Sequence, residues 1–367
     1  MPFTKRMVIE DWFDKYQFKA ETNIGESGVK WITPGDLGVD LSDTALRYGH
    51  HRGSPELREA IASEYDGLSA EHIAVTTGSS ESIFALIASL VGNGDEMVVQ
   101  LPNYPSHYYA AYSLDLEHSF YKLRFENDFK LDLVELFRLI TPKTKLISLT
   151  HPNNPTGSII STEELESIIE IIEANNAYLL MDETYRDLSY AEPPPPAACL
   201  SKRAISVTTM SKTYGAPGIR IGWAAVNDTS IIDKICAVRE QITICNSAIS
   251  EQLALEILLK KDDLLENSRQ QISKNLKILT FWMERQNALE WVAPQAGVVA
   301  FPRLKRGDSA DWLCTRLIED HATFTVPGSC FEMDSHLRLG YGGSTAQLER
   351  GLANLELTLD EMERETS

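Results

Sequence analysis

One glycine-punctuated stretch decides the fold prediction, and it reads Thr209-Met210-Ser211-Lys212-Thr213-Tyr214-Gly215-Ala216-Pro217-Gly218-Ile219-Arg220-Ile221-Gly222. A lysine is ordinarily a solvated surface residue. Lys212, however, stands between two hydroxyl residues and precedes Arg220 in a flexible segment. Hydroxyls and a guanidinium can hold a phosphate, while a desolvated lysine near other cations loses its proton and can form a Schiff base. The combination suggests that the chain binds pyridoxal 5'-phosphate (PLP).

The composition is that of an acidic globular protein. The chain has 367 residues, of which 43% are hydrophobic and 24% charged, with a formal net charge of −19. This length predicts one large and one smaller domain. The acidity disfavours nucleic acid as a partner, since phosphates need a basic face. Residues 1–6 show no apolar run, and no window approaches the ~20 apolar residues of a membrane helix. We therefore expect a cytoplasmic protein without a signal peptide or a membrane partner.

Buried strands alternate with helices over the first two thirds of the chain. We expect strands at 73–77, 96–100, 144–149, 177–181 and 204–208, and helices at 79–90, 131–139 and 162–174. This alternation predicts an α/β fold with a mostly parallel sheet covered by helices on both faces. Ligands of such sheets bind at the carboxyl ends of the strands.

Polar and aromatic residues follow these strands at the ends where a ligand is expected. Gly78-Ser79-Ser80 opens a helix, and the free amides and dipole of a helix N-terminus favour a phosphate, although many α/β turns of this kind bind nothing. The later strands are followed by Pro102-Asn103-Tyr104-Pro105, His151-Pro152-Asn153-Asn154-Pro155-Thr156-Gly157, Asp182-Glu183-Thr184-Tyr185 and Ser211-Lys212. Each segment alone has an ordinary explanation as a turn or cap. Their joint placement predicts one shared site.

The pattern of helices and strands in the last third of the chain predicts a smaller α/β domain. A helical stretch at 250–286 should bridge to it, followed by strands at 296–301 and 336–340 and a final helix from 345. We expect residues 36–250 to form the large PLP-binding domain, and residues 1–35 with 251–367 to form the small domain and an N-terminal active-site segment. Arg338 lies inside an apolar strand, so it either needs an anionic partner or lies exposed at an edge. The context favours the first.

His50 and His51 are the most conspicuous candidates for metal ligands. No third histidine or carboxylate stands at ligand spacing, so we expect no metal site. The five cysteines are scattered and form no CxxC pair, which indicates neither a zinc site nor a disulfide framework.

Taken together, the motifs resemble the fold-type I PLP enzymes of the class I and II aminotransferase family over nearly the whole chain. Ser211-Lys212-x-x-Gly215-x-x-Gly218-x-Arg220-x-Gly222 fits the lysine signature of that family. Asn154-Pro155-Thr156-Gly157 and Asp182-x-x-Tyr185 fit its other landmarks in order and spacing. The resemblance implies PLP as cofactor, an amino acid as the small-molecule substrate, and a homodimer with shared active sites. Thr209 stands where the signature prefers Gly or Ser, and it keeps the hydroxyl.

The resemblance also implies roles for individual residues. Lys212 should carry the Schiff base and move the catalytic proton, Asp182 should keep the pyridine nitrogen protonated, and Arg338 should bind the substrate α-carboxylate. Tyr104 should stack on the cofactor ring, with Asn154 and Tyr185 hydrogen-bonded to its oxygen. The phosphate contacts should come from Gly78, Ser79, Ser80, Thr209, Ser211 and Arg220, with Tyr48 reaching in from the neighbouring subunit.

The amino-terminal region resembles a narrower group. Glu10-Asp11-Trp12 and the segment 18–29 look like capreomycidine synthase and its relatives, including enduracididine-forming and arginine-oxidising enzymes, which work on arginine or hydroxyarginine. A guanidinium needs a planar carboxylate partner, and Glu10 or Glu26 would supply one if this segment folds over the active site. Alternatively, both are solvated surface acids. Gly25 would let the backbone approach the substrate, or it belongs to an ordinary turn.

Three enzymatic hypotheses follow. The first is a PLP-dependent lyase or cyclase of natural product biosynthesis that acts on a hydroxyarginine through the Lys212 aldimine. It would eliminate water and close the guanidine into a cyclic guanidino amino acid. The second is an ordinary aminotransferase, and the third is an arginine oxidase. An inactive scaffold is disfavoured because Lys212, Asp182 and Arg220 are all present.

Overall fold

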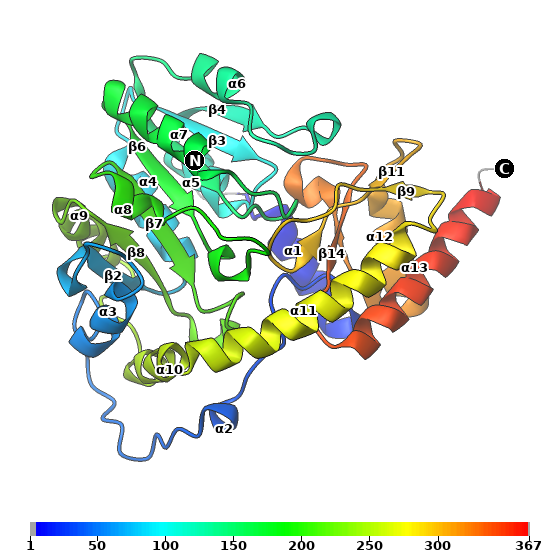
Figure 1. The fold of residues 1–367 in the computed structure, drawn as a ribbon, viewed down its shortest axis with the longest axis horizontal. Helices are drawn as coiled ribbons and strands as arrows, with labels where there is room; N and C mark the ends of the chain where they lie inside the picture. Colours follow the sequence, from blue (N-terminus) through cyan, green and yellow to red (C-terminus); the bar gives the residue numbers. More distant parts are fainter. Residues whose placement is uncertain (1–4, 366–367) are drawn as a thin grey trace.

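The computed structural model describes residues 5–365, so Met1 to Thr4 of the opening segment lie outside the described residues. Figure 1 shows two lobes side by side, a larger one built on a seven-stranded sheet and a smaller one that contains three short sheets. The helix α11 (Lys261–Met283) runs along the bottom of that view from the larger lobe to the smaller one.

The large sheet has the strand order β2-β8-β7-β6-β5-β3-β4. Every neighbouring pair is parallel except the two that involve β8, which is antiparallel to β2 and to β7. The predicted mostly parallel sheet is therefore confirmed. Its strands are β2 (Ile73–Thr76), β3 (Glu96–Leu101), β4 (Glu117–Lys122), β5 (Thr144–Thr150), β6 (Tyr178–Asp182), β7 (Ala204–Thr209) and β8 (Gly222–Val226).

Helices cover both faces of this sheet because alternate residues of each strand point to opposite sides. On β6, Leu180 packs with α4 (Ser79–Leu90), α5 (Ser106–Leu114) and α9 (Ser230–Arg239). Leu179 and Met181 of the same strand pack on the opposite side. That side is covered by α6 (Leu133–Arg138), α7 (Thr162–Ala174) and α8 (Ala197–Leu200).

The remaining helices flank the large sheet or build the smaller lobe. The predicted helix at 250–286 is broken at Lys260, whose backbone leaves the helical region and whose ammonium donates to the carbonyl of Leu37. The helices are α1 (Val8–Tyr16), α2 (Pro34–Leu37), α3 (Pro55–Ala62), α10 (Ala248–Leu259), α12 (Ala310–His321) and α13 (Thr345–Glu365). The 3-10 turns are η1 (Gln17–Lys19), η2 (Ala70–His72), η3 (Phe125–Asn127), η4 (Arg186–Leu188), η5 (Pro217–Ile219) and η6 (Gly328–Phe331).

Three short sheets form the core of the smaller lobe. They have the orders β1-β12, β10-β14-β13 and β11-β9. Their strands are β1 (Thr22–Asn23), β9 (Leu289–Glu290), β10 (Val299–Ala300), β11 (Arg303–Leu304), β12 (Thr323–Phe324), β13 (Val326–Pro327) and β14 (Leu337–Gly340). The parallel pair of β1 with β12 attaches the amino-terminal segment to this lobe.

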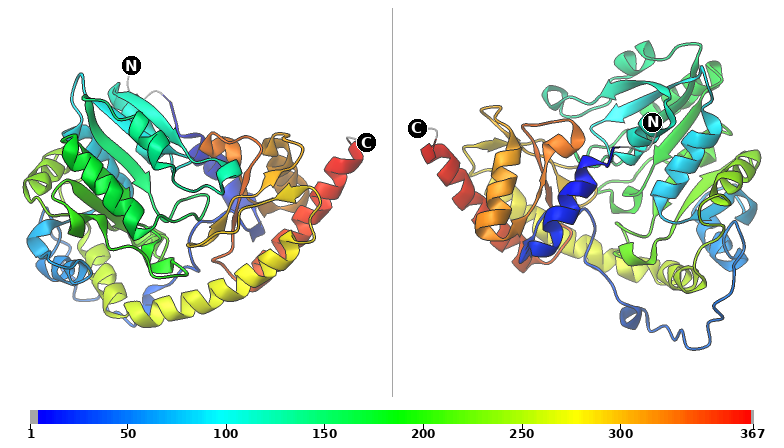
Figure 2. Two further views of the ribbon diagram at one scale, coloured as in Figure 1. Left: turned by 45° about the horizontal axis from the view of Figure 1, so that its top comes forward. Right: turned by 180° about the vertical axis from the view of Figure 1, so that it is seen from behind.

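The amino-terminal helix α1 lies between the two lobes (Figure 2). The indole of Trp12 donates to the carbonyl of Thr325 at 2.8 Å, and the ring of Phe13 packs edge-on against Phe324 at 5.0 Å between centroids. These contacts attach α1 to the smaller lobe, with its other side toward the large sheet.

The segment 24–32, called the strap below, crosses from the smaller lobe to the larger one. Its first residue, Ile24, accepts a hydrogen bond from the amide of Gly340 at 2.7 Å. Further along, the amide of Val29 donates to the carbonyl of Lys212 at 3.0 Å, and the amide of Ile32 donates to Gly215 at 3.0 Å. The strap thus joins both lobes at the lysine.

We propose the domain boundaries expected from the sequence, near residues 36 and 250. The strands of the large sheet all lie between those positions, and the short sheets use only residues outside them. Within residues 5–365, no helix combines the length and the apolar character that crossing a bilayer requires.

The close approach of the strap to glycine backbone gives a stability prediction. A Cβ atom on Gly340 would lie 1.9 Å from the carbonyl oxygen of Glu26, whereas one on Gly343 would meet no atom within 4 Å. We expect Gly340→Ala to lower the free energy of unfolding by about 2 kcal/mol or more. Gly343→Ala should stay within about 0.5 kcal/mol of the unmodified protein. Urea denaturation of the two variants measures both, and equal midpoints would contradict the prediction.

Candidate active site

A cavity of about 350 Å³ lies where the strap, α1 and the carboxyl ends of the large-sheet strands meet. It brings together most of the residues predicted from the sequence. They are Glu10, Glu26, Ser79, Ser80, Tyr104, Asn154, Asp182, Tyr185, Thr209, Ser211, Lys212, Arg220 and Arg338. Gly25 and Gly78 lie behind the lining and contact two of its arginines. Tyr48 lies elsewhere.

Lys212 and Arg220 share one closed loop. The antiparallel pairing of β7 with β8 sets Thr209 opposite Gly222, and the amide of Met210 donates to the carbonyl of Ile221 at 2.9 Å. The chain therefore leaves the sheet, presents both cationic side chains to the cavity, and returns beside its starting point.

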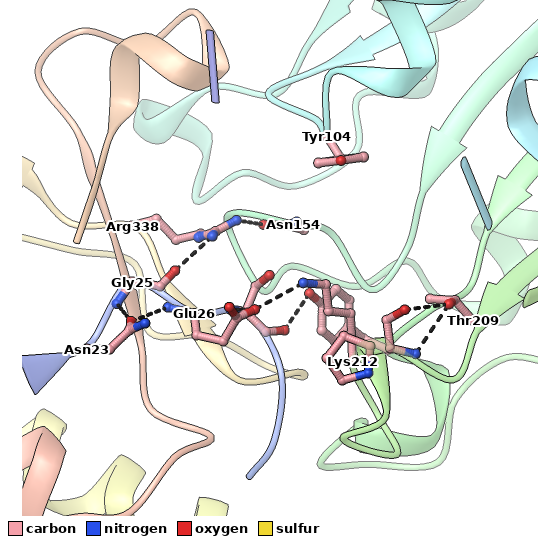
Figure 3. Close-up of polar contacts among 12 residues, drawn as sticks. Asn23, Gly25, Glu26, Tyr104, Asn154, Thr209, Lys212 and Arg338 are labelled. Carbon is pink, nitrogen blue, oxygen red and sulfur yellow. Dashed lines mark hydrogen bonds and ion pairs between the residues drawn. The ribbon is translucent and has the colours of Figure 1, made fainter. Parts of the chain in front are cut away.

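The ammonium of Lys212 meets a carboxylate from the strap. Its Nζ lies 3.1 Å from Oε1 of Glu26, which also accepts a hydrogen bond from the amide of Ser27 at 3.0 Å (Figure 3). Burial opposes ionisation of Glu26, but the positive charges of Lys212 and Arg338 outweigh it, so the pKa of Glu26 is lowered. In the structure, Glu26 therefore forms an ion pair with Lys212 inside the cavity and is not a solvated surface acid.

Asp182 ends β6 deep in the cavity, and three groups hold its carboxylate. The amide and hydroxyl of Thr184 donate to Oδ1 at 3.0 and 2.6 Å. Nε2 of His107 lies 3.3 Å from Oδ2, while Nδ1 of the same ring lies 2.7 Å from the hydroxyl of Ser148. His107 and Thr184 were not among the predicted site residues. The sequence gives only a weak indication of these contacts, namely His107 near the start of α5 and Ser148 in the buried strand β5.

The beginning of α4 forms a cradle for an anion. Its N-cap, Gly78, has φ +75° and supplies no capping side chain, so the first amides of the helix face the cavity uncapped. A Cβ on Gly78 would lie 2.5 Å from Nη2 of Arg220, and one on Gly222 would lie 2.5 Å from the amide of Ser79. Only glycine therefore permits this close packing.

Hydroxyls complete this donor set. Nη1 of Arg220 donates to the hydroxyl of Ser211 at 3.2 Å, and that hydroxyl lies 2.9 Å from the hydroxyl of Thr209. A guanidinium, several hydroxyls and a helix N-terminus suit a phosphate dianion. The residues present therefore fit the phosphate of PLP, with Lys212 on the same loop to receive its aldehyde.

Two tyrosines and an asparagine surround the space next to Lys212. Tyr104 lies across the cavity from Lys212 and Glu26 in Figure 3. The hydroxyl of Tyr185 donates to the carbonyl of Ser27 at 2.7 Å, and burial raises the pKa of Tyr185. Oδ1 of Asn154 accepts a hydrogen bond from Arg338 at 3.2 Å. An aromatic face above the lysine and polar groups at its side suit a flat heteroaromatic ring.

Arg338 is buried in the central strand of its sheet, so the alternative of an exposed edge residue is wrong. Its side chain is 1% exposed, and Nη2 donates to the carbonyl of Gly25 at 2.8 Å. Nε has no hydrogen-bond partner, and within residues 5–365 no carboxylate lies at ion-pair distance from this guanidinium. Burial lowers its pKa. A buried cation in this state favours an anionic ligand.

The helix α1 supplies a second carboxylate to the cavity. Oε1 of Glu10 accepts a hydrogen bond from the hydroxyl of Tyr104 at 2.7 Å, and Phe13 of the same helix and Gln17 of the following turn η1 also line the cavity. Burial, followed by the negative charge of Glu10, raises the pKa of Tyr104. The amino-terminal segment therefore does fold over the site.

Tyr48 lies outside this cavity. It is 81% exposed and lines a separate hollow of about 520 Å³ with Gly49 and Glu251. Its contact with the cofactor of a neighbouring subunit stays a prediction.

His51, one of the two histidines considered as metal ligands, pairs with Glu240 at 2.9 Å. Residues 5–365 contain no group of three or more His, Cys, Asp or Glu side chains placed to hold a metal.

The fold and the site together define a PLP-dependent enzyme of fold type I. The chain belongs to the aminotransferase class I and II family, which it matches over residues 30–355. It is similar to capreomycidine synthase of Streptomyces vinaceus, with 30% identity over 94% of this chain and 91% of that protein. It is also similar to a probable N-acetyl-LL-diaminopimelate aminotransferase of Bacillus subtilis, with 29% identity over 86% and 82% of the two chains.

Solved structures give the same result. A PLP-dependent aminotransferase from Streptococcus suis superposes with a TM-score of 0.93 at 30% identity, covering 98% of both chains. The PLP-dependent cyclase OrfR superposes with a TM-score of 0.91 at 27% identity, also over 98% of both chains. PLP is therefore the cofactor, whereas the part that each residue plays around it is a proposal.

The residue after Asp182 gives a prediction for pH dependence. Glu183 is buried, and its Oε1 accepts a hydrogen bond from the amide of Ala197 at 2.8 Å. Burial raises its pKa from 4.5 to about 7. Between these values the folded protein keeps a proton that the unfolded chain has released, so the free energy of unfolding falls as the pH rises and stays lowered above about pH 7.

We expect Glu183→Gln to remove this decline, because an amide oxygen still accepts from Ala197 and carries no charge. Relative to the unmodified protein, the variant should gain about 3 kcal/mol in unfolding free energy between pH 4 and pH 8. Urea denaturation of the cofactor-free proteins at several pH values measures this difference. Parallel profiles for the two proteins would refute the prediction.

Proposed function

We propose that the protein is a PLP-dependent cyclodehydratase that acts on a hydroxyarginine, eliminates water and closes the guanidine into a cyclic guanidino amino acid. One observation carries the proposal, namely that α1 brings the carboxylate of Glu10 into the same cavity as the buried cation of Arg338. A substrate with a carboxylate at one end and a guanidinium at the other suits these two charges. The similarity to capreomycidine synthase and to the cyclase OrfR supports the same choice.

The two charges would orient the substrate. Arg338 binds the α-carboxylate through its guanidinium, whose Nε has no protein partner. Glu10 binds the planar guanidinium of the side chain, with Tyr104 holding one of its oxygens. Paired charges of fitting geometry fix both ends of the molecule and leave the carbons between them next to Lys212.

PLP, when bound at Lys212, withdraws electrons from the α-carbon of the substrate. Asp182, held by Thr184 and His107, keeps the pyridine nitrogen protonated, which strengthens that withdrawal. The amine of Lys212 takes the proton from the α-carbon and returns a proton to the departing hydroxyl. One carbon–oxygen bond breaks and water leaves. A guanidine nitrogen then forms a bond to that carbon and gives up its proton, and Lys212 returns a proton to the α-carbon.

An ordinary aminotransferase is the second candidate. The family match and the Bacillus subtilis relative favour it, since Lys212, Arg338 and the phosphate cradle would serve amino-group transfer equally well. An arginine oxidase would use the same side chains. For each of these reactions we also propose a homodimer in which Tyr48 reaches the cofactor of its partner, and a cytoplasmic location.

The reaction itself separates these functions. We expect the PLP-loaded protein to convert β- or γ-hydroxyarginine, without any keto acid, into a product lighter by one water, with no ammonia or keto acid formed. Mass spectrometry and an ammonia assay measure this outcome. Turnover that depends on an added keto acid would show an aminotransferase, and oxygen consumption would show an oxidase. Either result overturns the cyclodehydratase.

Glu10 gives a second prediction. Glu10→Gln keeps the size of the side chain and loses its charge, so we expect hydroxyarginine binding to weaken by about tenfold or more, with PLP affinity unchanged. Asp11→Asn is the matched control, because Asp11 is an adjacent acid of α1 that pairs with Arg6 at the surface. Spectroscopic titration with the substrate measures the affinities. Equal affinity in Glu10→Gln and Asp11→Asn would remove Glu10 from the binding site.

A further inference from the structure

We propose that Glu26 is a positioning residue for Lys212, which holds the lysine nitrogen in place and favours the protonated form of its linkage to the cofactor. This differs from the role first expected for Glu26, which was to bind the guanidinium of the substrate. The inference rests on the proposed attachment of PLP to Lys212, and it is independent of which substrate the enzyme converts.

The geometry of the pair is tightly defined. Nζ of Lys212 lies 3.1 Å from Oε1 of Glu26, and the side chains are 29% and 21% exposed. The amide of Ser27 donates to the same oxygen at 3.0 Å. Oδ1 of Asn23 accepts from the amides of Gly25 and Glu26, so the turn that carries the carboxylate is itself fixed (Figure 3).

The strap also fixes the carboxylate relative to the lysine backbone. The amide of Val29, three residues beyond Glu26, donates to the carbonyl of Lys212 itself. Between them, the carbonyl of Ser27 accepts from the hydroxyl of Tyr185 at 2.7 Å. Glu26 and Lys212 are therefore joined through their main chains as well as through their charges, which lowers the entropy cost of keeping the ion pair formed.

The other acids of the cavity have different partners. Asp182 is held by Thr184 and His107, and Glu10 is held by Tyr104. Among the ion pairs of the described residues, the pair with Glu26 is the one that involves Lys212. Arg338 adds a second positive charge, which with Lys212 keeps Glu26 ionised. The cavity thus separates its carboxylates, with one for the cofactor ring, one for the lysine and one at the end where the substrate side chain is proposed to bind.

An ionised carboxylate beside the lysine–cofactor linkage favours the protonated form of that linkage. Opposite charges within about 4–6 Å commonly shift the pKa of a group by about 1–3 pH units. A protonated lysine–cofactor linkage is the form that the amino group of a substrate attacks. The carboxylate also gives the released lysine a fixed place from which it can return a proton. Glu26 would therefore act through Lys212 without touching the reacting carbons.

The visible absorbance of the PLP-loaded protein tests this inference, because it changes when the lysine–cofactor linkage loses its proton. We expect Glu26→Gln to lower the pH midpoint of that change by about 1–3 units. Glu26→Met, a second neutral variant, should do the same. Glu26→Asp keeps the charge and should restore most of the shift, while Glu10→Gln, which removes a carboxylate bonded to Tyr104, should leave the midpoint unchanged.

Two outcomes would overturn the inference. One is a midpoint in Glu26→Gln and Glu26→Met equal to that of the unmodified protein. The other is an equal shift in Glu10→Gln, which would mean that only the total charge of the cavity matters. A different failure belongs to the attachment itself: a visible band with the same pH dependence in Lys212→Ala would show that PLP does not bond to this lysine, whatever the midpoints of the other variants.

Discussion

The strap at 24–32 is the constraint on which the rest of the site depends. Its backbone is hydrogen-bonded to Gly340 in one lobe and to Lys212 and Gly215 in the other. Within that span, its carbonyl groups accept from Arg338 and Tyr185, and its one acidic side chain pairs with Lys212. A short extended segment therefore sets the separation of the lobes and the position of the lysine together. A shift of the strap would move the lysine, the proposed carboxylate-binding arginine and a ring-side tyrosine at the same time.

Parallel strands explain why residues far apart in sequence meet here. Tyr104 and Lys212 follow β3 and β7, and Asp182 ends β6; the carboxyl ends of these strands lie along one edge of the sheet. The smaller lobe adds a buried cation to this edge, and α1 adds an exposed carboxylate. The residues that fit the cofactor thus come from the large sheet, whereas the residues proposed to select the substrate come from segments outside it.

The sequence predicted the parts that depend on local pattern and spacing. Buried strands and the residues at their ends were predicted because apolar runs and helix caps are visible along the chain, and Arg338 stood out as a charge within an apolar strand. The edge strand β4 has a polar, partly exposed sequence, and β8 begins at Gly222, the last residue of the stretch interpreted as the lysine loop, so neither was predicted. The partners of Glu26 and His107 lie 186 and 75 positions away, and no local pattern reveals such contacts.

The closed loop between β7 and β8 has a consequence for how such enzymes diverge. Because its two ends are paired as neighbours in the sheet, the spacing between the lysine and the arginine is an internal property of one hairpin. Segments such as α1 can then change in sequence, and new substrates can be accommodated, without altering the loop that carries Lys212 and Arg220. One fold can in this way keep its coenzyme-binding loop while the segments that cover the cavity change in sequence and the reaction changes with them.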